Sequence, residues 1–290
     1  MMTTERNVFE IEGLECAYDH NGRNGKNVIL RIERLSVPMG SLSIILGLSG
    51  SGKSTLIETL GLMNHTIHSG FFTYFHAENK VVIDRDTWNC PSALATIRNR
   101  HFSFIFQHDF LMPYYTPEEN MLIGSLIQGS DKTGSRAKEE MGNLCLKMGL
   151  DPGGISRKKA CELSVGQKQR LSFIRAIIKD YDVIFGDEPA GNLDELNSGL
   201  LMDVLKDSVH QNDRRSAILV SHDIPLSVAN ADCLIVLSPA AEDTYEVLQE
   251  NVFSRTATGW SGGDNVRMAD DQIDTKIRKI ICEKKSLSAP

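Results

Sequence analysis

The sequence predicts an α/β fold in which a mostly parallel sheet has an antiparallel β edge and is interrupted by a helical insert. Residues 7–46 alternate β-type segments with polar turns and end in SLSIIL, which is apolar enough for a buried strand. Residues from about 108 to 175 are chiefly helical in their spacing. Strand patterns return in YDVIFGDE and SAILVSHD, with a helical pattern between them. We therefore expect one α/β core with an inserted helical subdomain.

The N-terminal elements lead into a strand–loop–helix unit centred near residue 50. NVFEIEG, GLECAYD, VILRIERLSV and SLSIIL are separated by the NGRNG loop and by Pro38 and Gly40, which predicts an antiparallel edge followed by a buried strand. After Gly52 the apolar residues Leu56 and Leu60 fall at helical intervals. A helix is therefore expected directly after the glycine-rich segment.

The insert and the C-terminal residues show helical patterns of their own. In the insert, apolar residues fall on one helical face before a DPGG stop at 151–154: Ala137, Met141, Leu144 and Met148. We assign residues 1–250 to one α/β domain, with the helical subdomain at about 108–175, and residues 251–290 to a C-terminal extension.

The C-terminal extension is polar and loop-like through TATGWSGGD and then becomes amphipathic. Isoleucines recur at helical spacing beside several basic residues: Ile273, Ile277, Ile280 and Ile281. The pattern is compatible with a basic surface helix, but a terminal helix that docks on its own domain is the favoured interpretation.

Composition and charge exclude several classes of function. The 290 residues have a formal net charge of -7 and no basic stripe, which argues against nucleic acid as a partner. No apolar stretch approaches the roughly 20 residues of a membrane helix. The N-terminus lacks the apolar region of a secretory signal, so a cytoplasmic location is expected. Six scattered cysteines without C-x-x-C spacing argue against both zinc and a disulfide framework.

The segment GLSGSGKST fits the phosphate-binding pattern G-x-x-x-x-G-K-[ST] through Gly47, Gly52, Lys53 and Ser54. A strand precedes it and a helix follows, so backbone N–H groups and a helix N-terminus would surround a phosphate. Lys53 is expected to reach the β- and γ-phosphates, and the Ser54 hydroxyl to bind Mg2+. The segment predicts a P-loop NTPase core of RecA type, in which the nucleotide contacts Gly47, Ser49, Gly50, Ser51, Gly52, Lys53, Ser54 and Thr55.

The segment DVIFGDEP places two carboxylates at the end of an apolar strand. The carboxyl edge of a parallel sheet is where ligands bind. Asp187 is expected to hold Mg2+, and Glu188 to polarise the attacking water as general base. Two acids at a strand end are also common in solvated loops, so this segment alone leaves both interpretations open.

Further segments, in order along the chain, resemble those of ATP-binding-cassette proteins over about residues 7–240. ELSVGQKQR at 162–170 resembles the signature sequence of that family and lies just ahead of DVIFGDEP. The other matching segments are IFQHDF with Gln107, GNLD with Asp194 and LVSHD with His222. Tyr18 matches the aromatic residue that stacks on adenine. The resemblance implies an ATPase whose cofactors are ATP and Mg2+.

The resemblance also implies roles for individual residues. His222 would contact the γ-phosphate and steady Glu188, and Gln107 would touch the metal ion or the water. Metal contacts are thus expected from Ser54, Gln107 and Asp187. Asp194, next to the two acids, would belong to the nucleotide site.

The signature segment is expected to serve a second copy of the chain. Ser164 is a good helix N-cap, so the N–H groups behind it can face an anion. In the family this segment faces the phosphate loop of another copy, which implies a homodimer around two ATP, with contacts from Ser164, Gly166 and Gln167. The usual glycine pair is replaced by Val165-Gly166, a departure that raises the question of the loop's geometry.

The segments FIFQHDFLMPYYTPEENML and DEPAGNLD most resemble the macrolide-efflux, lipoprotein-release and cell-division branch. This implies a separate membrane permease as partner, with the chain peripheral on the inner face of the cell membrane. Residues 111–115 either form an apolar docking patch for that permease or pack inside the insert. A cell-division-type ATPase that regulates cell-wall enzymes without transport is the alternative, and a cassette that binds ATP without hydrolysis is disfavoured because the catalytic residues are present.

Overall fold

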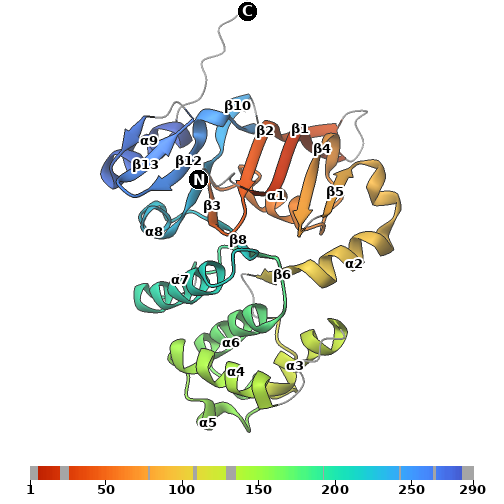
Figure 1. The fold of residues 1–290 in the computed structure, drawn as a ribbon, viewed down its shortest axis with the longest axis vertical. Helices are drawn as coiled ribbons and strands as arrows, with labels where there is room; N and C mark the ends of the chain where they lie inside the picture. Colours follow the sequence, from red (N-terminus) through yellow and green to blue (C-terminus); the bar gives the residue numbers. More distant parts are fainter. Residues whose placement is uncertain are drawn as a thin grey trace, which may run out of the picture.

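Two β-sheets and the helices that cover them make up the computed structural model of the chain (Figure 1). The described residues are 6–19, 26–77, 79–106, 110–128, 135–191, 193–241, 243–263 and 266–282. In this part of the chain, no helix combines the length and apolar character needed to cross a membrane.

The larger sheet has eight strands in the order β14-β13-β12-β9-β3-β8-β7-β6. Five of them run parallel: β9 (Cys233–Val236), β3 (Leu42–Leu46), β8 (Ser216–Ser221), β7 (Val183–Asp187) and β6 (Phe102–Ile105). All five residues of β3 are buried, as expected for a strand covered on both faces. The predicted parallel core and the predicted strands before residues 47, 188 and 222 are confirmed.

The smaller sheet has six strands in the order β10-β11-β2-β1-β4-β5. They are β10 (Ser238–Ala241), β11 (Thr244–Val247), β2 (Lys26–Pro38), β1 (Asn7–Asp19), β4 (Ile67–His76) and β5 (Asn79–Asp84). β1 pairs antiparallel with β2 and β4, so the predicted antiparallel edge is confirmed.

The two N-terminal segments predicted as separate strands form the single strand β1. Gly13 has φ +57°, and the pairing of β1 with β4 shifts register between Glu12 and Glu15. On the neighbouring strand β4, Gly70 lies so close to Gly13 that an added Cβ would be 2.0 Å from the Gly13 carbonyl oxygen. The glycine therefore forms a bulge where the two backbones approach closely, instead of a turn.

The hydrophobic core has two parts, one on each face of the larger sheet, and helices cover both. α1 (Lys53–Leu60) packs between the two sheets, where Leu56 and Leu60 join a cluster with Phe9 and Ile45. On the other face of the larger sheet lie α6 (Val165–Ile178), α7 (Glu195–His210) and α8 (Ile224–Asn230). α2 (Pro91–His101) follows a short 3-10 helix, Asp86–Asn89, and leads into β6.

The segment before α6 is helical, as expected, and contains α3 (Pro117–Gln128), α4 (Ser135–Lys147) and α5 (Pro152–Ile155). These helices lie together at one end of the molecule (Figure 1). The DPGG segment is not only a stop: the Asp151 carboxylate accepts hydrogen bonds from the N–H groups of Gly153 and Gly154 and so begins α5. Two further 3-10 turns are Ala160–Glu162 and Gln249–Asn251.

The prediction of a loop through TATGWSGGD is wrong. β12 (Val252–Thr256), β13 (Gly259–Gly262) and β14 (Arg267–Met268) form an antiparallel extension of the larger sheet. The Trp260 ring is fully buried, and its Nε1 donates to Asp270 Oδ1 at 3.1 Å. The free edge of β9 supplies the pairing partner that a local polar composition cannot reveal.

The amphipathic C-terminal pattern forms α9 (Asp270–Cys282), which docks on its own domain. Ile273, Ile277 and Ile281 are buried in the cluster that also contains Trp260, and Ile280 is partly buried. The favoured docking interpretation is thus confirmed. The division of the chain at residue 250 stays a prediction.

Candidate nucleotide-binding site

The glycine-rich loop joins β3 to α1 in the conformation that the phosphate-binding pattern predicts. Gly50 and Gly52 have φ values of +79° and +87°, which side chains with a Cβ rarely adopt. The Lys53 ammonium donates to the carbonyl oxygens of Gly47 at 3.0 Å and Leu48 at 2.7 Å. These bonds hold the lysine over its own loop.

A cavity of about 240 Å3 opens at this loop. Its lining consists of Ile29, Ser49, Gly50, Ser51, Gly52, Lys53, Ser54, Thr55 and Glu188. The Ser51 hydroxyl is buried without a hydrogen-bond partner among the described residues. Gly52, which precedes α1, has no side chain to cap the first N–H groups of the helix. The cavity therefore offers several donors to an anion.

Burial and two nearby carboxylates act in opposite directions on Lys53, and its pKa is lowered overall. Burial lowers the pKa of the Lys53 ammonium, and the carboxylates of Glu188 and Asp187 act in the opposite direction. A bound phosphate would favour the charged lysine in the same way as these carboxylates. The loop is thus suited to a ligand with several negative charges.

Glu188 lies just beyond the end of β7 in a strained conformation, with φ +48°. Its N–H donates to the Val220 carbonyl at 3.1 Å, and its carbonyl accepts from the Gly191 N–H at 3.0 Å. Its Oε1 lies 3.3 Å from Nδ1 of His222, which follows the neighbouring strand β8. The side chains of Glu188 and His222 are 29% and 64% exposed, so water reaches both. The predicted pair of Glu188 and His222 is therefore brought together.

Tyr18 reaches the phosphate loop from the end of β1. Its hydroxyl lies 3.2 Å from Oγ1 of Thr55, and the residue is 47% exposed. The ring therefore lies beside the loop with a face open to solvent. Ile29 of β2 also lines the cavity but was not predicted, because an apolar residue within a strand pattern carries no binding motif.

The signature segment is built separately from this cavity. Ser164 caps α6: its Oγ accepts from the Gln167 N–H at 3.3 Å, and the Gln167 Oε1 accepts from the Ser164 N–H at 3.0 Å. Val165 is the first residue of α6 and is 71% exposed. None of the predicted contacts Ser164, Gly166 and Gln167 lines the cavity at Lys53. Within one chain, α6 begins nearer the helical end of the molecule, whereas α1 lies beside the two sheets (Figure 1).

Two other predicted residues have different outcomes. The Asp194 carboxylate caps α7, accepting from the backbone N–H and the side-chain amide of Asn197 at 2.9 and 2.7 Å. These hydrogen bonds lower the pKa of Asp194. A structural role is thus visible for Asp194, whereas Gln107 lies outside the described residues.

Residues 111–115 divide between the two interpretations that the sequence left open. Leu111 is buried, but Met112, Tyr114 and Tyr115 are 48%, 76% and 47% exposed, beside the 61% exposed Phe110. Asn120 fixes this turn because its side-chain oxygen accepts from the Met112 N–H at 2.7 Å. The segment therefore presents aromatic side chains on its surface.

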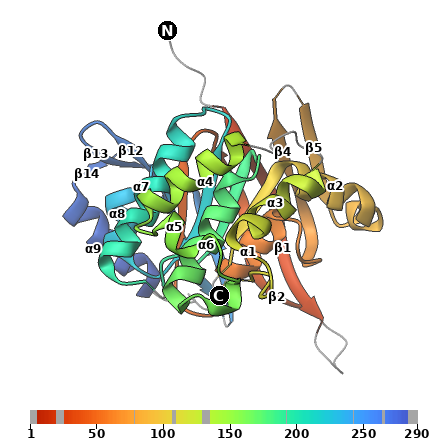
Figure 2. The ribbon, with the colours of Figure 1, turned by 90° about the horizontal axis from the view of Figure 1, so that it is seen from below.

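A phosphate loop at the end of one parallel strand, with a glutamate after β7 and a histidine after β8 beside it, defines the chain as a P-loop NTPase. Figure 2, seen from below, shows α4, α5 and α6 between the β12–β14 extension on one side and strands of the smaller sheet on the other. The chain belongs to the ABC transporter family, whose model matches residues 30–191.

Similar proteins support this assignment. The lipoprotein-releasing system ATP-binding protein LolD of Aquifex aeolicus (strain VF5) is 35% identical over 69% of this chain and 83% of its own length. The macrolide export ATP-binding/permease protein MacB of Pasteurella multocida (strain Pm70) is 30% identical over 79% of this chain. The match spans 33% of that longer protein.

Among solved structures, the dimeric structure of MJ0796, a bacterial ABC transporter cassette, has the same fold. Its TM-score is 0.65, at 23% identity over 79% of this chain and 93% of the other. The fold class expected from the sequence is therefore confirmed.

Proposed function

We propose that the chain is the ATP-binding and ATP-hydrolysing subunit of an ABC transporter. The observation that carries the proposal is the position of Glu188, which lines the Lys53 cavity and lies 3.3 Å from His222. A carboxylate in this position can take a proton from water that attacks the γ-phosphate. His222 is well placed to orient that carboxylate and to contact the γ-phosphate as charge develops.

The remaining residues of the cavity bind and position the nucleotide. Lys53 and the N–H groups at the start of α1 hold the β- and γ-phosphates, and Tyr18 stacks on the adenine. The Ser54 hydroxyl and the Asp187 carboxylate fit Mg2+, because hard oxygen donors are its preferred ligands; Gln107 is proposed as a further ligand. A Mg2+ ion held by these residues would neutralise charge on the phosphate oxygens.

A second copy completes each site. Ser164 and Gly166 lie at the exposed start of α6, away from the cavity of their own chain. The Ser164 Oγ accepts from Gln167, but its hydrogen remains able to donate to an anion. We assign Ser164, Gly166 and Gln167 to contacts with the γ-phosphate held by the partner copy, so that two ATP molecules lie in a homodimer. Asp194 is assigned to the same interface.

The partner of this dimer is proposed to be a membrane permease of the export or lipoprotein-release type. The exposed aromatic residues Phe110, Tyr114 and Tyr115 are suited to docking it. Through that contact the ATPase would lie at the inner face of the cell membrane. The similarity to MacB and LolD supports this type of partner.

Two experiments test the proposal. The purified chain should hydrolyse ATP in the presence of Mg2+, and Lys53→Ala should remove this activity, as measured by phosphate release. Cross-linking in membranes, followed by purification and identification of the bound permease, should recover an export or lipoprotein-release permease. Recovery of a regulator of cell-wall enzymes would instead establish the cell-division-type alternative.

A further inference from the structure

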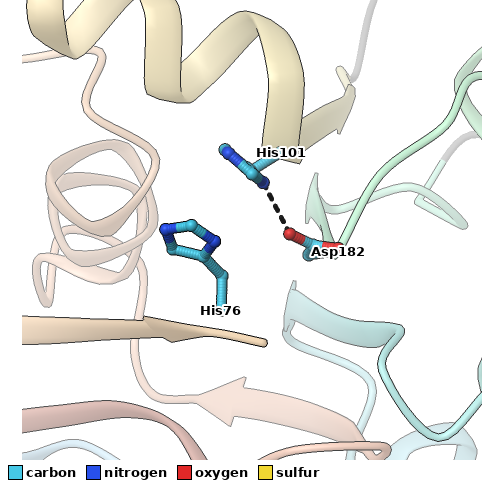
Figure 3. Close-up of side chains that lie close together, drawn as sticks. All are labelled: His76, His101 and Asp182. Atoms are coloured by element: carbon cyan, nitrogen blue, oxygen red, sulfur yellow. Dashed lines mark hydrogen bonds and ion pairs between the residues drawn. The ribbon is translucent and has the colours of Figure 1, made fainter. Parts of the chain in front are cut away.

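A cluster of two histidines and one aspartate lies at the opposite end of β7 from the nucleotide site. His76 ends β4, His101 ends α2, and Asp182 directly precedes β7. Asp187 and Glu188 are at the other end of that strand. Figure 3 shows the two imidazole rings and the carboxylate converging, although their elements are far apart in the sequence.

The contacts within the cluster are short. His101 Nδ1 lies 2.6 Å from Asp182 Oδ2, and the hydroxyl of Tyr74 donates to the same oxygen at 3.0 Å. The rings of His76 and His101 have centroids 4.4 Å apart. The Asp182 N–H also donates to the His101 carbonyl at 2.8 Å, which fixes the two backbones together. The cluster is therefore held in place by both backbone and side chains.

The imidazole of His76 has ring neighbours, but no hydrogen bond or ion pair joins this side chain to another described residue. It stacks on Tyr74, with ring centroids 5.3 Å apart, and contacts His101. The ring is only partly buried, and neither of its nitrogens is among the fully buried side-chain atoms that lack a partner. The ring is thus available to a ligand that enters the cluster.

The protonation states suit metal binding. Burial, with the neighbouring His101, lowers the pKa of His76 and so favours neutral imidazole. Burial raises the pKa of Asp182, but hydrogen bonds from His101 and Tyr74 outweigh it, so the carboxyl pKa is lowered. Neutral imidazole and ionised carboxylate are the forms that coordinate metal ions.

We propose that His76, His101 and Asp182 form a binding site for a divalent transition metal ion of the Zn2+ type. One ligand atom from each residue lies within 4.8 Å of the others, a condition that no other group of three His, Cys, Asp or Glu residues meets in the described part of the chain. Two imidazoles and one carboxylate are a donor set that Zn2+ accepts, with water as fourth ligand. The cysteine spacing, which argued against zinc, does not concern these ligands.

Small side-chain rotations complete the coordination. Bonds of about 2.0–2.2 Å to a tetrahedral ion place ligand atoms roughly 3.4 Å apart. The 2.6 Å contact between His101 and Asp182 must therefore open, and wider separations must close, by about 1 Å. The side chains of His101 and Asp182 are 25% and 33% exposed, which leaves them a route to solvent. The Tyr74 hydroxyl, which donates to Asp182 Oδ2, is placed to orient the carboxylate as an outer partner of the site.

A metal ion here would join three elements of the fold. β4 belongs to the smaller sheet, whereas β7 belongs to the larger one, and α2 leads into β6 beside β7. Binding to the folded chain alone raises its stability by mass action. We therefore expect Zn2+ to raise the melting temperature of the full chain.

The test uses the full chain after treatment with a chelator. Isothermal titration with ZnCl2, in excess Mg2+ to occupy oxygen-ligand sites, should show one ion bound per chain. His76→Ala and His101→Ala should each lower the affinity by at least about 100-fold, because the loss of a direct ligand exceeds the 10- to 100-fold effect of an outer partner. Tyr74→Phe should show that smaller effect. Co2+ absorption in the visible range provides a second readout of tetrahedral ligation.

His210→Ala is the matched control, because His210 pairs with Asp232 at 3.0 Å without a second histidine. It should keep the wild-type affinity. A melting curve recorded in chelator establishes whether each variant is folded. If an alanine variant is not folded, His76→Gln is used in its place, because that change removes no side-chain hydrogen bond. Equal Zn2+ affinity of the wild type and the folded His76 variant, or no binding by the wild type, would overturn the proposal.

Discussion

The two halves of the nucleotide site differ in how far one chain completes them. At the phosphate loop, Lys53, Glu188 and His222 each follow one of three parallel strands; Lys53 and Glu188 line one cavity, and His222 contacts Glu188. At the start of α6, Ser164 and Gln167 cap the helix through two mutual hydrogen bonds, and Ser164 is exposed to solvent. The first half contains the groups for chemistry, and the second offers donors to an anion that its own chain does not hold. The variants below test this division.

The largest effect is expected at Glu188. Glu188→Gln keeps the shape of the side chain but removes the base, so phosphate release should fall by about 10²- to 10⁴-fold. ATP binding should survive, and the variant should elute as a dimer in ATP and Mg2+ on size exclusion. Hydrolysis close to that of the wild type would place the chemistry elsewhere.

The next largest effect is expected at the signature half. Ser164→Arg fills the space of the phosphate and should abolish turnover, a loss of at least about 10²-fold as for other anion-site donors. Subunits with Ser164→Arg mixed with subunits with Lys53→Ala should recover some phosphate release, because the heterodimer has one intact site. Absence of recovery in mixtures where heterodimers are demonstrated by cross-linking would contradict the shared site.

Substitutions in the exposed aromatic turn beside α6 should weaken permease binding and leave basal ATP hydrolysis unchanged. Tyr114→Ser with Tyr115→Ser should weaken permease binding by about 2 kcal/mol or more, because exposed aromatic side chains are frequent interface anchors. Stimulation of hydrolysis by permease in vesicles should fall while basal hydrolysis stays. Leu146→Ser is the control, since Leu146 is 65% exposed in the same helical segment. A joint fall of both activities with the melting temperature would assign the tyrosines to the core.

The smallest effect is expected at Val165. As the first residue of α6, it adopts helical dihedral angles that a β-branched side chain tolerates, and it is 71% exposed. Val165→Gly should therefore change the hydrolysis rate by less than about tenfold, or ~1.4 kcal/mol of barrier. A larger gain in phosphate release would show that the native signature is weakened.

Much of the fold was predictable from local pattern. The β3 strand and its glycine loop were recognised because apolar periodicity and glycine spacing are read within about ten residues. The same holds for β7 and β8. The strands β4 and β5 and the β12–β13 extension were not predicted, because their pairing partners lie far away in the chain. Trp260 shows this most clearly, since a polar segment surrounds a fully buried ring.

Local sequence pattern was sufficient to identify the residues of the phosphate loop and the two acids, since each is a contiguous motif whose conformation follows from glycine and strand preferences. The pair of Glu188 and His222 was implied by the family resemblance, whereas the contact of Tyr18 with Thr55 and the place of Ile29 in the cavity lining required the tertiary structure. It also decided the cluster of His76, His101 and Asp182, which has no motif. Contacts between residues distant in sequence depend on sheet order and register, and no local pattern specifies these.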